Sequence, residues 1–321
     1  MYQEKIATLS LPKSLEFLVV KLSEKDTFTS KEAAELLLRS YVQADDLIDY
    51  VAFDHEIDES YGKKVIYEGS NFEILAKSWA PGDFSAIHDH GISEWGAIKV
   101  FGCLEHSTFV QDQKYLTTES VIQFNSGVIS TLDESLIHQM GNPTSHNILS
   151  LHIYGINQYA PKITQDSRIY DITSGMVFKT NGGAFYEADF HQLKITDEVV
   201  LGDYPCWLSN LVHQISRTKK MAQFSRLKDL LYSLRSKEHR DRLNDFLEGK
   251  LDGEGRFISK NQEKIFAKAI SSLGRLLGDY PHYHRKLDVR VQVDKFKSVF
   301  IVHLADKQLL LDYSHDKLVI S

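Results

Sequence analysis

The stretch GDFSAIHDHGISEW, residues 82–95, carries the strongest structural and chemical signal in this chain. His88 and His90 are two residues apart, and alternate residues of a β-strand point to the same face. In a strand of a small barrel, both imidazoles would therefore point into the interior. His138 follows in a second segment of β character, and three imidazoles can hold a divalent metal such as Fe, Ni, Cu or Zn. An isolated His-x-His pair is a weak signal, because many such pairs are surface or core residues without a metal.

The sequence on either side predicts β structure preceded by helices. From residue 64 to about residue 200, apolar runs of five to eight residues alternate with Gly, Asp, Asn and Ser, as in an all-β sandwich or barrel. Residues 12–50 read as helical, with Leu15, Leu18 and Leu22 on one face and a capping-box pattern that starts at Thr29. His106 and His146 lack the paired spacing of His88 and His90, and we interpret both as surface or loop residues.

A second region begins near residue 200. Residues 1–200 carry 15 Lys and Arg against 29 Asp and Glu, whereas residues 201–321 carry 22 against 15. This change of sign predicts a domain boundary, with one domain at 1–200 and another at 201–321. After Tyr204-Pro205 the spacing is helical, and from Leu287 it alternates as in strands, so the second domain is expected to be α+β. Its basic charge fits attraction between the two domains better than an anionic partner.

Composition excludes several classes of protein. Hydrophobic residues make up 42% of the 321 residues, which is enough for a sizeable core and excludes extensive disorder. The two cysteines cannot form a disulfide framework and fit a reducing compartment. We find no signal peptide and no apolar run long enough for a membrane span, so we expect a cytoplasmic protein with no membrane association. Nucleic acid is not expected as a partner, because the chain has no helix-turn-helix and no basic recognition helix.

Three blocks of the chain resemble the cysteine dioxygenase type I family of thiol dioxygenases, within the cupin superfamily. They are WAPGDFSAIHDHG at 79–91, His138 with Asn142, and SLHIY at 150–154. The resemblance lies within residues 12–195 and implies a mainly β cupin fold, a double-stranded β-helix barrel with N-terminal helices, followed here by a smaller α+β C-terminal domain. It also implies an Fe(II) ion held by His88, His90 and His138, which oxidises a small-molecule thiol to its sulfinic acid with O2.

The strand expected at 150–154 has its polar side chains on one face. Ser150, His152 and Tyr154 alternate with apolar residues, and buried polar groups are costly unless they are paired or face a site. The pattern alone allows a hydrogen-bonded core network without a catalytic role. The resemblance implies instead a catalytic relay, in which Ser150 holds His152, and His152 holds the Tyr154 hydroxyl near the metal.

The chain departs from the family at three positions. The family's carboxylate-binding Arg follows a Tyr by two residues, and the matching segment here places Lys63 after Tyr61, so both are candidate substrate-binding residues. Lys lacks the planar fork of Arg, which leaves the substrate's acidic end open. Trp95 matches the Cys that crosslinks to the relay Tyr in animal enzymes and is a third candidate for substrate binding. Glu94 is the position at which many cupins have a fourth metal ligand.

Two alternatives follow from these departures. If Glu94 binds the metal, a different metal-dependent cupin reaction is favoured over thiol oxidation. A non-enzymatic cupin sensor, with the basic C-terminal domain as its output, is the other alternative. The sequence does not identify the thiol, the oligomeric state or the role of residues 201–321.

Overall fold

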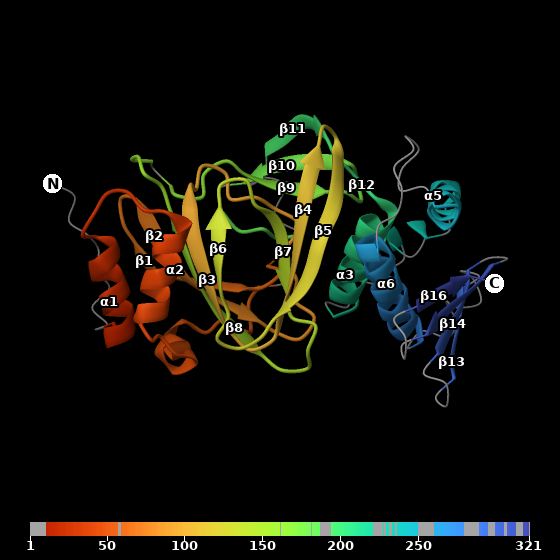
Figure 1. The fold of residues 1–321 in the computed structure, drawn as a ribbon, viewed down its shortest axis with the longest axis horizontal. Helices are drawn as coiled ribbons and strands as arrows, with labels where there is room; N and C mark the ends of the chain where they lie inside the picture. The colour runs from red at the N-terminus through yellow and green to blue at the C-terminus, as the bar shows by residue number, and fades with distance from the viewer. Residues whose placement is uncertain are drawn as a thin grey trace.

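The computed structural model describes most of the chain. The described residues are 11–56, 59–160, 162–180, 182–186, 194–220, 227, 229–230, 233–234, 236–249, 260–278, 289–294, 299–304, 307–312 and 317–320. Two β-sheets form the central body, with helices packed on the outer face of each (Figure 1).

The first sheet has five strands in the order β1-β2-β8-β3-β6. Their bounds are β1 Gly62–Glu68, β2 Phe72–Trp79, β8 Ile148–Gly155, β3 Trp95–Phe101 and β6 Ile129–Asp133. The helices α1 (Lys13–Leu22) and α2 (Ser30–Arg39) and the 3-10 helix η1 (Ala44–Tyr50) pack on its outer face. Leu15, Leu18 and Leu22 are fully buried in this layer, which confirms the predicted apolar face of α1. Thr29 forms the capping box of α2 as predicted.

The second sheet has the order β12-β5-β4-β7. Its strands are β4 Leu104–Asp112, β5 Tyr115–Phe124, β7 Ile137–Gly141 and the short β12 Leu201–Gly202. Isolated bridges from Phe84 to Gly141 and from His88 to His138 place residues 84–88 beside β7. A further bridge, His88 to Ile169, links this segment to the sheet of β9 (Ser167–Asp171), β10 (Met176–Thr180) and β11 (Lys194–Val199).

The chain passes back and forth between the two main sheets. Strands β2, β3, β6 and β8 belong to the first sheet, and β4, β5 and β7 belong to the second. All pairings among these strands are antiparallel. This connectivity makes a double-stranded β-helix, so the expected cupin-type fold is confirmed. Alternation along β2 and β8 then turns one set of side chains toward the interior and the other toward α1 and α2.

The C-terminal part is α+β, as predicted. It contains α3 (Tyr204–Lys220), α5 (Lys237–Leu247) and α6 (Lys260–Gly278), then an antiparallel sheet β13-β14-β15-β16. The bounds of these strands are Val289–Asp294, Val299–Leu304, Lys307–Asp312 and Lys317–Ile320. Side chains of α3 and α6 share a hydrophobic core with Phe109, Leu116 and Ile137 of the barrel. The division at residue 200 stays a prediction. Strand β12, which follows residue 200, pairs with β5, which precedes it.

Within the described ranges, each helix is too short or too polar to cross a membrane.

Candidate metal centre

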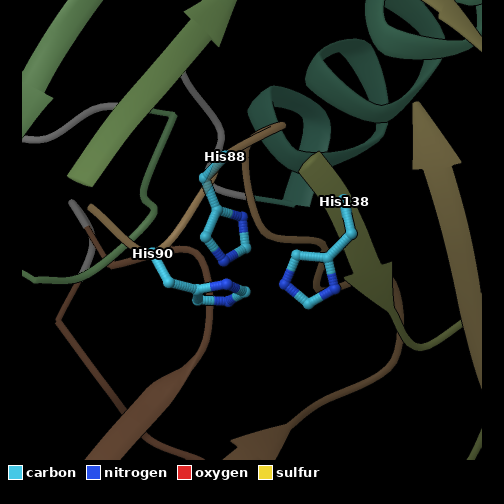
Figure 2. Close-up of side chains that lie close together, drawn as sticks. All are labelled: His88, His90 and His138. Atoms are coloured by element: carbon cyan, nitrogen blue, oxygen red, sulfur yellow. The ribbon is translucent and has the colours of Figure 1, made fainter. Parts of the chain in front are cut away.

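Three buried histidines converge at the wall of the barrel formed by β7 and the segment beside it. The candidate ligand atoms of His88, His90 and His138 all lie within 4.8 Å of one another. Their ring centroids are 4.6 Å apart for His88 and His138, 4.8 Å for His90 and His138, and 5.3 Å for His88 and His90. Figure 2 shows the three rings turned toward a common point. The structure therefore brings together the three residues that the sequence analysis selected.

Backbone pairing and the carboxylate of Asp89 hold the segment that carries His88 and His90. Residues 88–90 form an extended segment rather than the regular strand that we predicted, and the two backbone hydrogen bonds between His88 and His138 are each 2.9 Å long. Asp89, between the two histidines, is buried. Its carboxylate accepts hydrogen bonds from the backbone and side chain of Arg168, both 2.7 Å, and from the Tyr170 hydroxyl at 3.1 Å. Asp89 therefore anchors the His-x-His segment to β9.

The hydrogen bonds of the three rings leave a nitrogen of each one available to a metal. His88 Nδ1 bonds the Ala86 carbonyl at 2.9 Å, which leaves its Nε2. Within the described part of the chain, neither nitrogen of His90 has a hydrogen-bond partner, nor has His138 Nε2. Buried polar atoms without partners are costly, and a divalent metal would satisfy His138 Nε2 and one nitrogen of His90 at once. The donor set thus fits a metal ion.

Burial keeps these imidazoles neutral, which is the form that binds metals. Loss of solvation, with a smaller contribution from the positive charge of Lys77, lowers the pKa of His88 to about 3. The pKa values of His90 and His138 also lie well below the ordinary value, mainly because of burial and secondly because of His88. No proton has to be displaced from these rings at neutral pH before a metal binds.

His106 is a part of this centre that the sequence analysis missed. Its Nε2 lies 2.9 Å from His138 Nδ1, and its ring stacks on Phe124 with centroids 4.7 Å apart. Our interpretation of His106 as a surface or loop residue is wrong, since it is buried on β4. No local pattern indicates this, because residues on both faces of β4 are buried from Leu104 to Ser107. An outer hydrogen bond of this kind fixes the tautomer and orientation of a metal ligand. His146 is exposed, as expected.

Glu94 lies outside the histidine cluster. One of its carboxylate oxygens accepts a hydrogen bond of 2.9 Å from the backbone N–H of Asn157, at the exposed end of the barrel. The cluster of possible ligands in the described chain consists of His88, His90 and His138 alone. The arrangement gives no support to a Glu94 ligand and leaves three neutral ligands.

A row of hydrogen bonds runs along the inner face of β8. Ser150 Oγ accepts from Trp79 Nε1 at 2.8 Å and lies 2.8 Å from His152 Nε2. His152 Nδ1 lies 3.0 Å from the Tyr154 hydroxyl, and the Tyr154 ring is 5.1 Å from the ring of His90. The predicted hydrogen-bonded order Ser150, His152, Tyr154 is present, and it ends at the histidine cluster. Burial, with a smaller contribution from Tyr61, raises the pKa of Tyr154 well above its ordinary value, so the phenol is neutral.

A pocket opens onto the histidines, and two lysines contribute to its wall. The lining residues of this pocket are Tyr61, Lys63, Glu73, Leu75, Lys77, His88, Asp89, His90, Tyr154, Thr164, Ser167, Thr180, Gly182, Gly183 and Ala184. Tyr61 stacks on Trp79 with centroids 4.6 Å apart, and its hydroxyl accepts from the backbone N–H of Ala184 at 3.1 Å. Lys63 lines the pocket while its neighbour Lys64 is exposed, which is the orientation that alternation predicts. The substrate contacts of Tyr61 and Lys63 stay predictions.

Trp95 does not line this pocket. Its ring lies on the outer face of the first sheet, 5.1 Å from the ring of Phe28, in the core shared with α1 and α2. The ring also approaches Gly155 so closely that a side chain there would overlap it. The assignment of Trp95 to substrate binding is wrong. The match of Trp95 to the Cys of the animal enzymes does not show to which side of the sheet position 95 points.

Lys77 is a second residue that the sequence analysis did not select. It lies on the inner face of β2, in phase with Leu75 and Trp79, and its Nζ is 3.1 Å from the Tyr154 hydroxyl. Burial lowers its pKa to about 7, and the positive charge of Lys63 acts in the same direction. A period-two pattern of Glu73, Leu75 and Lys77 was visible in the sequence, but it did not show which face was internal.

Comparison with known proteins gives similarity of fold over part of the chain. A scan against protein-family models gives no match. A Klebsiella pneumoniae protein with a double-stranded β-helix domain is 15% identical, with a TM-score of 0.28, over 35% of this chain and 88% of that one. A sugar phosphate isomerase of the cupin superfamily from Silicibacter pomeroyi is 15% identical, with a TM-score of 0.31, over 47% and 87%. Oxalate decarboxylase from Lactobacillus farciminis is 16% identical, with a TM-score of 0.28, over 33% and 31%. At these scores the assignment of the fold rests on the chain's own sheet topology.

Proposed function

We propose that the protein is an Fe(II)-dependent thiol dioxygenase that converts a small-molecule thiol to its sulfinic acid. The observation that carries this proposal is the row Ser150, His152 and Tyr154, which ends beside His90 at a centre of three histidines. Such a row provides a fixed hydroxyl at the edge of a metal centre. The reaction balances as R–SH + O2 → R–SO2H, with both oxygen atoms added to sulfur and no external reductant.

The three histidines would hold the metal through neutral ligands. Because no carboxylate of the described chain joins them, the charge of the ion is not reduced by its ligands, and positions on the pocket side are left for substrate. Iron bound there would supply the acidity that ionises a thiol and the redox chemistry that activates dioxygen. His106 would hold His138 in the tautomer that presents Nε2 to the ion.

The other pocket residues would bind and orient the substrate. Lys63 places a positive charge on the pocket wall, which suits a thiol that also carries a carboxylate. The Tyr154 hydroxyl would donate a hydrogen bond to the reacting group, with His152 and Ser150 fixing its position. The metal-dependent cupin reaction that uses Glu94 loses support, because that carboxylate is engaged by Asn157. The sensor alternative gives no reason for a relay beside the metal.

Oxygen uptake by the iron-loaded protein tests this proposal. The protein is loaded with Fe(II) without oxygen and then mixed with cysteine, thioglycolate or cysteamine in an oxygen electrode, and the product is identified by mass spectrometry. We expect uptake of one O2 per thiol consumed and a sulfinic acid product. Oxidation of none of these thiols by protein that holds iron would contradict the proposal.

Tyr154→Phe tests the role of the relay. We expect this variant to keep its iron and to lose roughly ten- to a thousand-fold in kcat, because the hydroxyl acts on the substrate and is not a ligand. Tyr159→Phe is the matched control, since Tyr159 is 81% exposed. Equal kcat values for wild type and Tyr154→Phe would mean that the row on β8 only packs the core.

A further inference from the structure

Lys77 places a positive charge in the interior of the barrel with few partners. The residue is 5% exposed, and its Nζ lies 5.0 Å from the ring centre of Tyr61 and 5.5 Å from that of Tyr154. Among the described residues, Nζ has a single hydrogen bond, to the Tyr154 hydroxyl, and no ion pair. A buried ammonium with one hydrogen bond destabilises a fold. Lys77 therefore does not stabilise the fold, and we look for its role in the pocket.

The hydrogen bonds on β8 have a definite direction. An indole N–H only donates, so Ser150 Oγ accepts from Trp79, and the Ser150 hydroxyl is left to donate to His152 Nε2. His152 is neutral, because burial holds its pKa well below the ordinary value. An imidazole that accepts at Nε2 carries its proton on Nδ1, and this N–H donates to the Tyr154 oxygen. The direction thus runs from Trp79 through Ser150 and His152 to Tyr154.

The Tyr154 oxygen then receives a second hydrogen bond from Lys77. The phenol oxygen accepts from two donors, the His152 N–H and the Lys77 ammonium. No further group of the described chain lies within hydrogen-bond distance to accept the phenol proton. Its own O–H is left to donate toward the pocket that both Tyr154 and Lys77 line. A neutral amine at Lys77 could accept instead, and the phenol proton would then turn to Nζ and away from the pocket.

We propose that Lys77 is a positioning residue, whose ammonium holds the Tyr154 hydroxyl as a hydrogen-bond donor directed into the metal pocket. The direction of the hydroxyl follows from the contacts above, and its use in thiol oxidation rests on the proposed function. Lys77 is not one of the three candidate metal ligands and is not part of the row on β8. Its effect on kcat can therefore be separated from metal binding.

The groups that face Lys77 set the conditions under which it is charged. Lys63 on β1 disfavours the ammonium and Glu73 on β2 favours it, while Tyr61 and Tyr154 contribute neutral rings. The histidines on the far side of the pocket are neutral because they are buried. Deprotonation of Lys77 as the pH rises should therefore turn the Tyr154 proton away from the pocket and lower kcat.

A double-mutant cycle tests whether Lys77 acts through Tyr154. In iron-loaded protein we expect Lys77→Met to lower kcat about tenfold, the size of one lost hydrogen bond, without loss of iron. In the Tyr154→Phe background the same change should have no further effect on kcat. Lys77→Arg should restore part of the loss, and the exposed Lys64→Met is the control. Additive losses, or no loss in Lys77→Met, would overturn the proposal.

Lysine NMR of the metal-free protein gives a readout that does not depend on any activity. With lysines labelled at the ε-carbon, the Lys77 resonance is identified by its absence in Lys77→Arg. We expect this resonance to titrate near neutral pH and to shift its titration downward in Tyr154→Phe, because the ammonium loses its acceptor. An unchanged titration in Tyr154→Phe would overturn the proposal even if thiol oxidation is established. The expected shift together with a lack of thiol oxidation would refute the proposed function alone.

Discussion

Replacing Lys77 by Met should change how the stability of the fold depends on pH. The pKa of Lys77 falls from the ordinary value of 10.5 to about 7, mainly because the side chain is buried. Between these two values the unfolded chain holds a proton that the folded chain has released. The free energy of unfolding therefore rises with pH in this window. Each pH unit contributes about 1.4 kcal/mol once the folded chain has lost its proton, and at pH 7 it has lost about half, so between about pH 7 and about pH 9 the wild type gains roughly 2 kcal/mol that Lys77→Met does not gain.

Urea unfolding of the metal-free protein measures this difference. Well below pH 7 both states of the wild type are protonated, and Lys77→Met should be the more stable protein there, because it buries no charge. The other buried groups titrate in both proteins and cancel to first order. Lys64→Met serves as the control, since Lys64 is exposed. Parallel pH profiles for wild type and Lys77→Met, or a variant that is less stable throughout, would refute the reasoning.

Three further changes test the metal centre and its pocket. His106→Leu should weaken metal binding by about ten- to a hundred-fold in a competition with a chelator, because His138 loses its hydrogen bond, whereas His146→Leu should have no effect. Glu94→Gln should leave the iron content per chain unchanged, and a loss of iron would show instead that Glu94 is a metal ligand. Lys63→Met should raise the apparent KM for thioglycolate about ten- to a hundred-fold and change little for cysteamine, with Lys64→Met as the control; equal effects of the two would place the carboxylate contact elsewhere.

The local pattern of the sequence indicated which side chains of the site share a face, and the family resemblance selected the three histidines and the row on β8. Spacing by two residues puts Ser150, His152 and Tyr154 on one face of any strand, whatever surrounds it. The same rule predicts that Lys63 and Lys64 point to opposite sides, and Lys63 lines the pocket whereas Lys64 is exposed. The segment at 88–90 is not a regular strand, but bridges to His138 and Ile169 hold His88 beside β7 and β9.

Contacts between distant strands could not be predicted from the sequence. His106 is bonded to a residue 32 positions away, and Lys77 to one 77 positions away, so neither contact leaves a local signal. The error at Trp95 has the same origin. Trp95 and Ala97 point to the layer under α1 and α2, and only the sheet pairing shows that Gly96 is the residue opposite Tyr154. Which face of each strand is internal depends on the whole barrel.

In the proposed reaction, the three-histidine centre adds both atoms of dioxygen to the sulfur of a small thiol. The most direct measurement is mass spectrometry of the product formed by the iron-loaded protein under isotopically labelled dioxygen. We predict a sulfinic acid with two labelled oxygen atoms, and no such product from His138→Ala, which lacks one of the three ligands. A product with one labelled atom or none, or a labelled sulfinic acid formed equally by His138→Ala, would contradict this account.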